Sequence, residues 1–238
     1  MRYCHTSLIT IRFRNHPSPH ITRRHSSMDL QTALQQERSL FIQQKKNWVE
    51  IIVDFETANR YAIMDESQNT LGMIAEEGGG FITTIKRMIF RSHRGFDAKV
   101  VDNAGKIFLS LTRSFFFFFS DLWVTSETRP VGSVHRRFGI IYKKYDLRDA
   151  TGQTFATIKS PIWRLWTFPI SDTRGLLQGA EVTKRWGGLL KEAFTDADTF
   201  KVDFGNGPLT PQQRAVLFAA AISIDFDFFE KNQHRSQN

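Results

Sequence analysis

Hydrophobic and polar residues alternate in short runs along most of this chain, which is the pattern of half-buried β-strands. Three stretches repeat the order strand, polar turn, strand: "FDAKVVDNAGKIFLSLTR", "DLWVTSETRPVGSVHRR" and "KYDLRDATGQTFATIKS". In "DNAG" and "DATG" the glycine can adopt the positive φ of a tight turn, and the aspartate can accept hydrogen bonds from turn amides. The turn centres lie about 24 residues apart, the length of one hairpin with its connection. The sequence therefore predicts an antiparallel meander of roughly a dozen strands.

Two segments depart from the strand pattern. Residues 29–46 contain helix-forming residues with one weak apolar face, which indicates a short helix or a lead-in strand. In "GGGFITTIKRMIFRSHRGF", apolar residues recur at helical spacing and predict an amphipathic helix. Its cations are Lys86, Arg87, Arg91 and Arg94. Such a helix suits an anionic membrane surface, but a solvated helix face has the same pattern, so both interpretations stand.

The longest apolar run, Ala215 to Ile224, lies near the end of the sequence. Ten helical residues span about 15 Å, half of a hydrocarbon core of about 30 Å. Asp225 and Asp227 follow and point in different directions on a helix, so no rotation would hide both carboxylates from lipid. A helix that is apolar on all sides must be buried, and a closed sheet of about a dozen strands can hold one in its bore. The residues expected on this buried central helix are Ala215, Val216, Leu217, Phe218, Ala219, Ala220, Ala221, Ile222 and Ile224.

Composition and charge narrow the class of protein. With 238 residues, 41% hydrophobic and 24% charged, the chain has the composition of an ordinary globular protein of one large or two small domains. The net charge of +8 includes five arginines within residues 1–27, which contain no acidic residue, so the rest carries only +3. That modest charge argues against a nucleic-acid-binding surface. The single cysteine, Cys4, excludes an internal disulfide and a multi-cysteine zinc site, and indicates a reducing, intracellular compartment.

The basic segment at residues 1–27 has two interpretations. An acid-free leader with arginine and serine is typical of a mitochondrial transit peptide. It also fits a disordered tail, or a start at Met28, and we favour these because no amphipathic period is sustained. The expected organisation is this tail, a lead-in segment at 28–47, a single barrel domain at 48–231 and a polar tail at 232–238.

Four stretches resemble the phospholipid scramblase family, which is related to the tubby-like and LURP-one-related proteins: "FETANRYAIMD", "YDLRDATGQTFATIKSPIW", "VTKRWGGLLKEAFTDADTFKVDF" and "RAVLFAAAISIDFDFFE". The resemblance implies a mainly β, tubby-like fold, a closed antiparallel barrel of about twelve strands around a central hydrophobic C-terminal helix. It also implies calcium-triggered, energy-independent movement of phospholipids between membrane leaflets. The alternative is a peripheral module that binds anionic lipids or phosphoinositides without transporting them, because one fold can serve several functions.

The stretch "DADTFKVDFGNG" occupies the place of the family's proposed calcium loop. Asp196 and Asp198 match the first two ligand positions, whereas Phe200 and Gly207 stand where oxygen ligands are wanted. Asp203 offers one further carboxylate. Because calcium takes about six to eight oxygen ligands, turn-forming aspartates are the alternative interpretation to a calcium site. Calcium is the one cofactor that the sequence suggests.

No hydrolase or transferase motif is present: the sequence lacks G-x-S-x-G, H-E-x-x-H and a phosphate loop. We therefore expect lipid translocation or lipid binding without bond chemistry, at a location peripheral to a membrane. The expected partners are anionic membrane phospholipids and no nucleic acid, and the oligomeric state is left open. The aromatic stretches "SFFFFFSDLWV" and "PIWRLWTFPI", the latter with Trp163 and Trp166, suit a core, a membrane or a partner surface.

Overall fold

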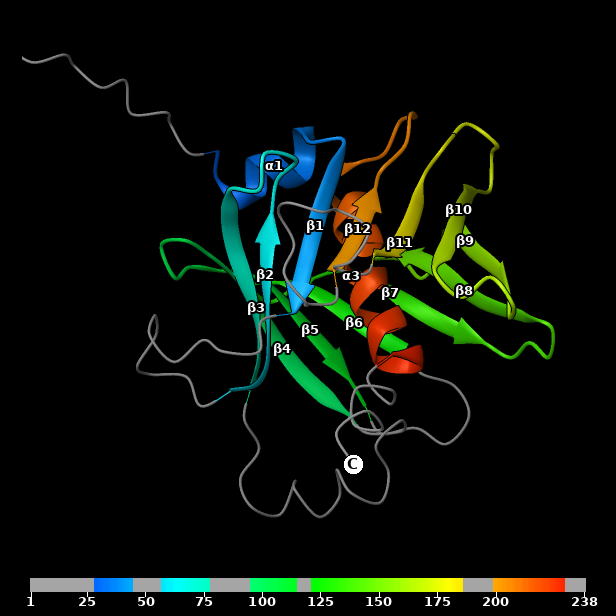
Figure 1. Cartoon of the computed structure of the whole chain (residues 1–238), viewed down its shortest axis with the longest axis horizontal. Helices are drawn as coiled ribbons and strands as arrows, with labels where there is room; N and C mark the ends of the chain where they lie inside the picture. The colour runs from blue at the N-terminus through cyan, green and yellow to red at the C-terminus, as the bar shows by residue number, and fades with distance from the viewer. Residues whose placement is uncertain (1–27, 45–56, 78–94, 115–120, 186–198, 230–238) are drawn as a thin grey trace, which may run out of the picture.

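The computed structural model describes residues 28–44, 57–77, 95–114, 121–185 and 199–229. Within these residues, twelve strands form one closed antiparallel barrel around a helix (Figure 1). The helices are α1 (Leu30–Gln36) and α3 (Pro211–Phe228). The strands are β1 (Ser39–Gln44), β2 (Thr57–Met64), β3 (Thr70–Glu77), β4 (Phe96–Asp102), β5 (Ile107–Arg113), β6 (Asp121–Ser126), β7 (Arg129–Arg137), β8 (Tyr142–Asp149), β9 (Thr154–Pro161), β10 (Thr167–Asp172), β11 (Glu181–Arg185) and β12 (Thr199–Asp203). The predicted mainly β fold, a closed barrel with a central C-terminal helix, is confirmed.

Each strand of the barrel pairs with the next strand in the chain, so the sheet is a meander up to its closing seam. At that seam β1 pairs with β12, from Ser39 opposite Asp203 to Gln43 opposite Thr199. The segment expected to be a short helix or a lead-in strand contains one of each, α1 and then β1. Because β1 also pairs with β2, it completes the ring, and a closed ring has no unpaired edge strand.

The hairpin turns have the predicted chemistry. Asp102 accepts hydrogen bonds from the backbone N–H groups of Ala104 and Lys106, each at 2.9 Å. Asp149 accepts hydrogen bonds from turn amides in the same way, and Gly152 has a φ of 85°. An L side chain would be strained at that φ, so glycine suits the turn. These local bonds hold each hairpin in register.

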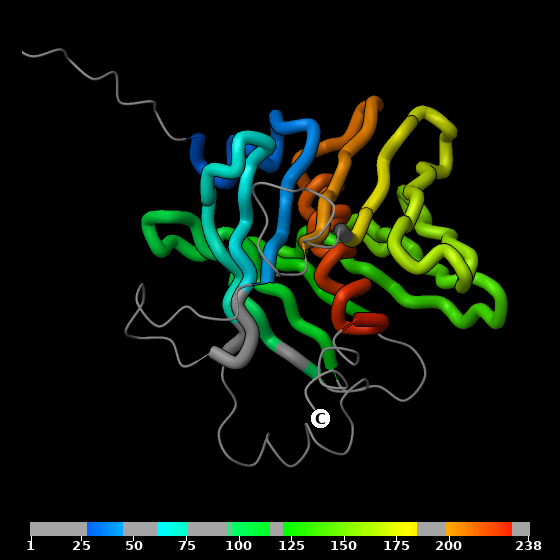
Figure 2. Tube along the Cα trace, viewed as in Figure 1, coloured from blue at the N-terminus to red at the C-terminus, as the bar shows by residue number. Residues whose placement is uncertain are grey.

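α3 begins with a capping box and then fills the bore. The Thr210 hydroxyl accepts a hydrogen bond from the Gln213 N–H, and the Gln213 side chain accepts one from the Thr210 N–H. This arrangement satisfies amides that lack a partner within the helix. The helix then runs through the barrel (Figure 2), with every residue from Ala215 to Asp227 buried. Among the described residues, no helix has the length and apolar character needed to cross a membrane.

β7 approaches α3 closely at Gly132. A Cβ atom at this glycine would lie 2.3 Å from the carbonyl oxygen of Arg148 and 2.7 Å from Cγ2 of Val216. Both distances are far shorter than van der Waals contact, and a close-packed interior cannot absorb them without movement. The glycine therefore sets how near the helix can come to this wall of the barrel.

The barrel has two distinguishable ends. At the α1 end, α1 lies against the start of α3 (Figure 1), and Arg214 donates hydrogen bonds to the backbone oxygens of Leu34 and Glu37. At the opposite end, which we call the distal end, α3 finishes at Phe228. Because neighbouring strands alternate in direction, the β7–β8 and β9–β10 connections both lie at the distal end.

Candidate functional site at the distal end of the barrel

The last turns of α3 carry two buried carboxylates, Asp225 and Asp227. Residues two apart on a helix point to different sides. The two carboxylates therefore bind different residues of the barrel wall. The Tyr61 hydroxyl of β2 donates to Oδ2 of Asp225 at 2.7 Å. The Tyr145 hydroxyl of β8 donates to Oδ2 of Asp227 at 2.7 Å, and Arg113 of β5 donates to Oδ1 of Asp227 at 3.0 Å. These bonds compensate for the removal of the carboxylates from water.

Asp227 is the centre of a cluster of buried charges. The side chains of Arg113 and Asp227 are both fully buried, and the Arg136 guanidinium lies 3.4 Å from Oδ1 of Asp227. Burial raises the pKa of Tyr145 well above its ordinary value, and the negative charge of Asp227 raises it further. Tyr145 therefore stays protonated and keeps its role as a hydrogen-bond donor.

Cations occupy inward positions at the distal ends of four strands. Because strand side chains alternate, Arg113 lies on the same face of β5 as buried Leu111, and Lys184 lies on the same face of β11 as buried Val182. In the same way, Arg136 lies on the same face of β7 as buried Val134, and Lys143 lies on the same face of β8 as buried Tyr145. We call the four residues the distal cations: Arg113, Arg136, Lys143 and Lys184.

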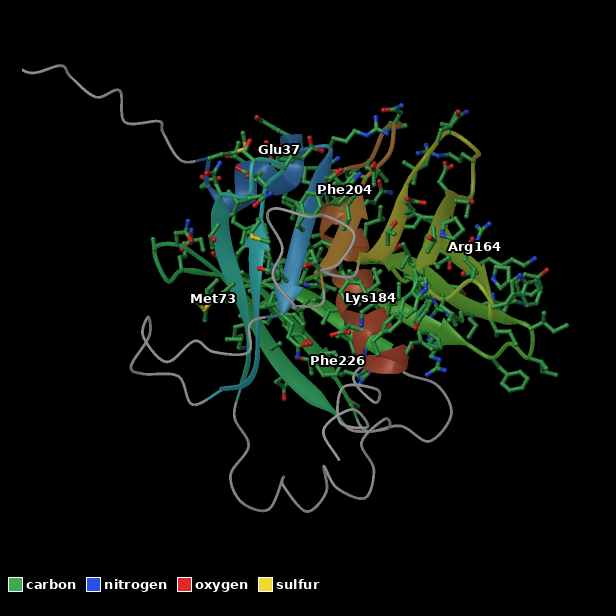
Figure 3. The ribbon with its side chains drawn as sticks, in the orientation of Figure 1. Glu37, Met73, Arg164, Lys184, Phe204 and Phe226 are labelled. Atoms are coloured by element: carbon green, nitrogen blue, oxygen red, sulfur yellow. The ribbon has the colours of Figure 1, made fainter. Side chains whose placement is uncertain are left out.

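All four distal cations lie over aromatic rings at the end of α3, and the guanidinium carbon of Arg113 lies 5.3 Å from the centre of the Phe226 ring. The guanidinium carbon of Arg136 lies 5.1 Å from the centre of the Phe228 ring, and Nζ of Lys143 lies 4.9 Å from the same centre. Nζ of Lys184, which Figure 3 labels beside α3, lies 4.0 Å from the centre of the Phe229 ring. These are favourable cation–π distances, and the C-terminus of a helix attracts positive charge as well.

Lys143 has the surroundings of an anion-binding residue. Its ammonium donates to the backbone oxygen of Arg164 at 3.3 Å and has no carboxylate partner within the ranges that the structure describes. Burial lowers the pKa of Lys143, which means that its charge is partly removed from water. A cation placed between aromatic rings, without a carboxylate among the described residues, can accept a phosphate as its counter-ion.

Most of the predicted lipid-binding and metal-binding residues lie outside the described residues. These are Lys86, Arg87, Arg91, Arg94, Asp196 and Asp198, and the run of five phenylalanines at 115–119 lies outside them too. All of these stay predictions.

Asp203, the third predicted calcium ligand, is described at the α1 end of β12. Its carboxylate accepts hydrogen bonds from Lys201 at 2.9 Å, Arg38 at 3.2 Å and the Gly205 N–H at 2.9 Å. Burial by itself raises the pKa of Asp203, but these hydrogen bonds and the two positive charges outweigh it and lower the pKa below its ordinary value. In the described part of the chain, no three histidine, cysteine or acidic side chains gather as a metal site. The calcium site stays a prediction.

Reasoning from the sequence did not single out the distal cations, although strand alternation contains a signal for them. In "FLSLTR" the apolar positions Leu109 and Leu111 are followed two residues later by Arg113. In "YKKYDL" the same spacing links Leu147, Tyr145 and Lys143. A cation that falls in register with inward apolar positions is rare unless it is paired, so this pattern marks a buried charge or a binding site.

Comparisons with known proteins identify relatives over most of the chain. The family model described as Scramblase matches residues 17–231. The chain is 28% identical to the Altered inheritance rate of mitochondria protein 25 of Saccharomyces cerevisiae, covering 86% of the chain and 74% of the relative. It is 27% identical to a phospholipid scramblase family protein of Schizosaccharomyces pombe, covering 81% of the chain and 59% of that protein. It is 26% identical to Phospholipid scramblase 1 of Mus musculus, covering 86% of the chain and 65% of that protein.

The chain thus spans less than two thirds of the length of the second and third of these relatives. A protein of Arabidopsis thaliana with a structure solved by X-ray aligns with a TM-score of 0.39 and 10% identity, over 79% of this chain and 90% of that one. The family match, in contrast, extends over nearly the whole sequence. The chain belongs to the scramblase family.

Proposed function

We propose that this protein takes part in energy-independent, bidirectional movement of phospholipids between the leaflets of a membrane. The observation that carries the proposal is the match of residues 17–231 to the Scramblase family. Relatives named phospholipid scramblases, from mouse and human among others, align over more than three quarters of the chain. The same activity is proposed for this chain, acting from a position peripheral to the membrane.

The distal cations give this proposal a physical site. A phospholipid headgroup carries a phosphate, and Lys143 and Arg136 place positive charge over the Phe228 ring at the distal end. Apolar side chains of α3 fill the bore, so we place the lipid path outside the barrel, along its distal end. There, a headgroup phosphate would bind near Lys143 while the acyl chains stay in the bilayer.

A scrambling measurement in proteoliposomes tests the proposal. The full chain is reconstituted with a fluorescent phospholipid, and an impermeant quencher reports how fast inner-leaflet lipid reaches the outer leaflet. We expect faster quenching than in protein-free vesicles, without leakage of an encapsulated dye. Lys143→Glu should slow quenching, and Lys106→Glu, at an exposed hairpin turn of the α1 end, should not. If folded, vesicle-bound protein gives no acceleration, the proposal fails and the protein is a lipid-binding module.

Calcium dependence is a separate arm of the same measurement. If Asp196, Asp198 and Asp203 hold calcium, chelator should abolish the acceleration and Asp196→Asn should have the same effect. Equal rates in calcium and chelator would reject the calcium site and leave the transport proposal intact.

The basic segment around Arg87 and Arg91 is a further proposed contact with anionic headgroups. Under this proposal, charge reversal at both positions should weaken binding to vesicles that contain phosphatidylserine. Unchanged binding would remove the segment from the proposed membrane contact.

A further inference from the structure

Exposed hydrophobic side chains are concentrated on two connections of the barrel. Nine large hydrophobic residues are exposed among the described residues, and six of them lie on the β7–β8 and β9–β10 connections. These six are Phe138, Ile140, Ile141, Ile162, Trp163 and Leu165. The exposed fractions reach 78% for Ile140, 70% for Phe138 and 68% for Trp163. Single exposed apolar residues are common on protein surfaces, but a contiguous group marks an interaction site.

The two connections form one surface, which we call the tip loops (residues 138–141 and 162–165). The Ile162 N–H donates to the backbone oxygen of Ile141 at 2.9 Å, which joins the loops directly. The rings of Tyr142 and Trp163 lie 6.5 Å apart, and Tyr142 pairs with Pro161 across the strands. The six apolar side chains therefore protrude from a braced pair of hairpins at the distal end.

Positive charge surrounds the tip loops. Residues 136–144 and 159–167 contain six basic residues and no acidic one. Arg136 and Arg137 are paired with Asp227 and Asp146. The other four have no carboxylate partner among the described residues: Lys143, Lys144, Lys159 and Arg164. In Figure 3, Arg164 lies on the side of the barrel from which these connections extend.

We propose that the tip loops dock the protein on a lipid bilayer that contains anionic headgroups. The six apolar side chains enter the interfacial region, and the surrounding lysines and arginines contact the headgroup phosphates. Apolar insertion together with positive charge is the combination that holds a peripheral protein on such a surface. This inference rests on the proposed function, because it brings Lys143 and the end of α3 to the membrane plane, where a moving lipid could reach them.

The charge of the surface favours a bilayer over a second copy of this chain. In a two-fold symmetric dimer the same patch meets itself, so the basic residues around one pair of tip loops would face those of the partner. Like charges within a Debye length of about 8 Å repel at physiological ionic strength. A surface of anionic headgroups attracts the same residues.

Vesicle sedimentation with matched variants tests the apolar part of the proposal. The full chain is mixed with vesicles of phosphatidylcholine and phosphatidylserine, and the bound fraction is measured after centrifugation. We expect Ile140→Asp and Trp163→Asp each to lower affinity at least about tenfold, because a carboxylate replaces an inserted apolar group. The control is Leu176→Asp, because Leu176 is also an exposed large apolar residue but lies at the α1 end. Affinity unchanged by both tip-loop substitutions, or lowered equally by the control, would overturn the proposal.

A charge-reversal pair tests the basic residues. The double variant Lys144→Glu, Arg164→Glu should lose the preference for phosphatidylserine over pure phosphatidylcholine vesicles, whereas Lys106→Glu should keep it. Retention of the full preference by the double variant would contradict a role for these residues.

A fluorescent label reports insertion directly. Cys4 is the only cysteine, so a Cys4→Ser, Ile140→Cys chain carries an environment-sensitive label at one tip-loop position. The label should shift to the blue when vesicles are added, and a label at Leu176→Cys should not. If the labelled protein sediments with vesicles but the label at position 140 does not shift, another surface binds the membrane.

The outcomes separate this inference from the proposed function. If the wild type scrambles lipids and both Ile140→Asp and Trp163→Asp bind vesicles with unchanged affinity, docking by the tip loops is rejected and transport stands. If the wild type binds through the tip loops but does not scramble, transport is rejected and docking stands. A dimer in solution that Ile140→Asp converts to monomer would assign the surface to self-association and overturn the inference.

Discussion

Arg113 and Asp227, far apart in the sequence, form an ion pair with both side chains fully buried. The guanidinium donates to Oδ1 of Asp227 at 3.0 Å, joining the distal end of β5 to the last turn of α3. Two charges removed from water cost several kcal/mol each unless they are paired. The pair therefore ties the position of α3 to the wall of the barrel.

Removal of one member of this pair should be strongly destabilising. We expect Arg113→Ala to lower the free energy of unfolding by about 3–5 kcal/mol, because Asp227 is left with an incompletely compensated charge. Urea denaturation followed by circular dichroism measures the change. Arg137→Ala is the matched control: Arg137 is exposed and Arg148 remains beside Asp146 after its removal, so the substitution should cost about 1 kcal/mol or less. Similar losses in the two variants would contradict a special role for the buried pair.

Tyr145 should give the fold a dependence on alkaline pH. Its folded-state pKa is raised above the unfolded value, so its contribution to stability is present below about pH 10 and is lost as pH rises further. Tyr145→Phe lacks both the hydrogen bond to Asp227 and the ionisable hydroxyl. We expect it to be about 1–2 kcal/mol less stable at neutral pH. Urea titrations from neutral to alkaline pH should show this difference shrinking above about pH 10; a constant difference would refute the assignment.

Gly132 should tolerate no side chain without movement of α3. A methyl group there would meet Cγ2 of Val216 and the carbonyl oxygen of Arg148. We expect Gly132→Ala to lower the free energy of unfolding by about 1–3 kcal/mol. In a double-mutant cycle with Val216→Ala, the combined loss should be smaller than the sum of the single losses, because the second change removes one of the two clashes. Strict additivity would show that Gly132 and Val216 do not limit each other.

Asp203 should make the barrel seam sensitive to acid. Its pKa is lowered in the folded state, so its contribution is present above the unfolded value of about 3.9 and is lost as pH falls through the lower folded value. Asp203→Asn should cost about 1–2 kcal/mol at neutral pH and should lose less stability than the wild type on acidification. Unfolding curves from pH 7 downward would reveal this; parallel acid dependence in the two proteins would contradict it.

The sequence predicted the fold in outline because the decisive signals are local. Strand alternation, the turns with aspartate and glycine, and the apolar run at 215–224 each extend over a few residues. The short length of that run and the two aspartates that follow it were enough to predict a buried helix inside a barrel. The seam was different: nothing within residues 39–44 indicates that their partner is β12, because that pairing depends on closure of the whole sheet.

The candidate site was less predictable for the same reason. The distal cations come from four strands and converge only when the ring closes around the end of α3. Three of them have a second basic residue beside them in the sequence (Arg137, Lys144 and Arg185), and the four stretches share no motif that marks the inward-facing cation. The tip loops were predicted only in part. The sequence marked the aromatic stretch that contains Trp163 as suited to a core, a membrane or a partner surface, but the exposure of Trp163 depends on how β9 and β10 meet.

The order of elements along the chain also constrains how this protein folds during synthesis. α3 supplies the centre of the core, yet it leaves the ribosome after all twelve strands. Until then the inward faces of the growing hairpins have nothing to pack against, and β1 must wait for β12 before the ring can close. The barrel therefore cannot fold hairpin by hairpin as it emerges. Its completion is a late event, and the nascent strands present apolar surface to chaperones until α3 arrives.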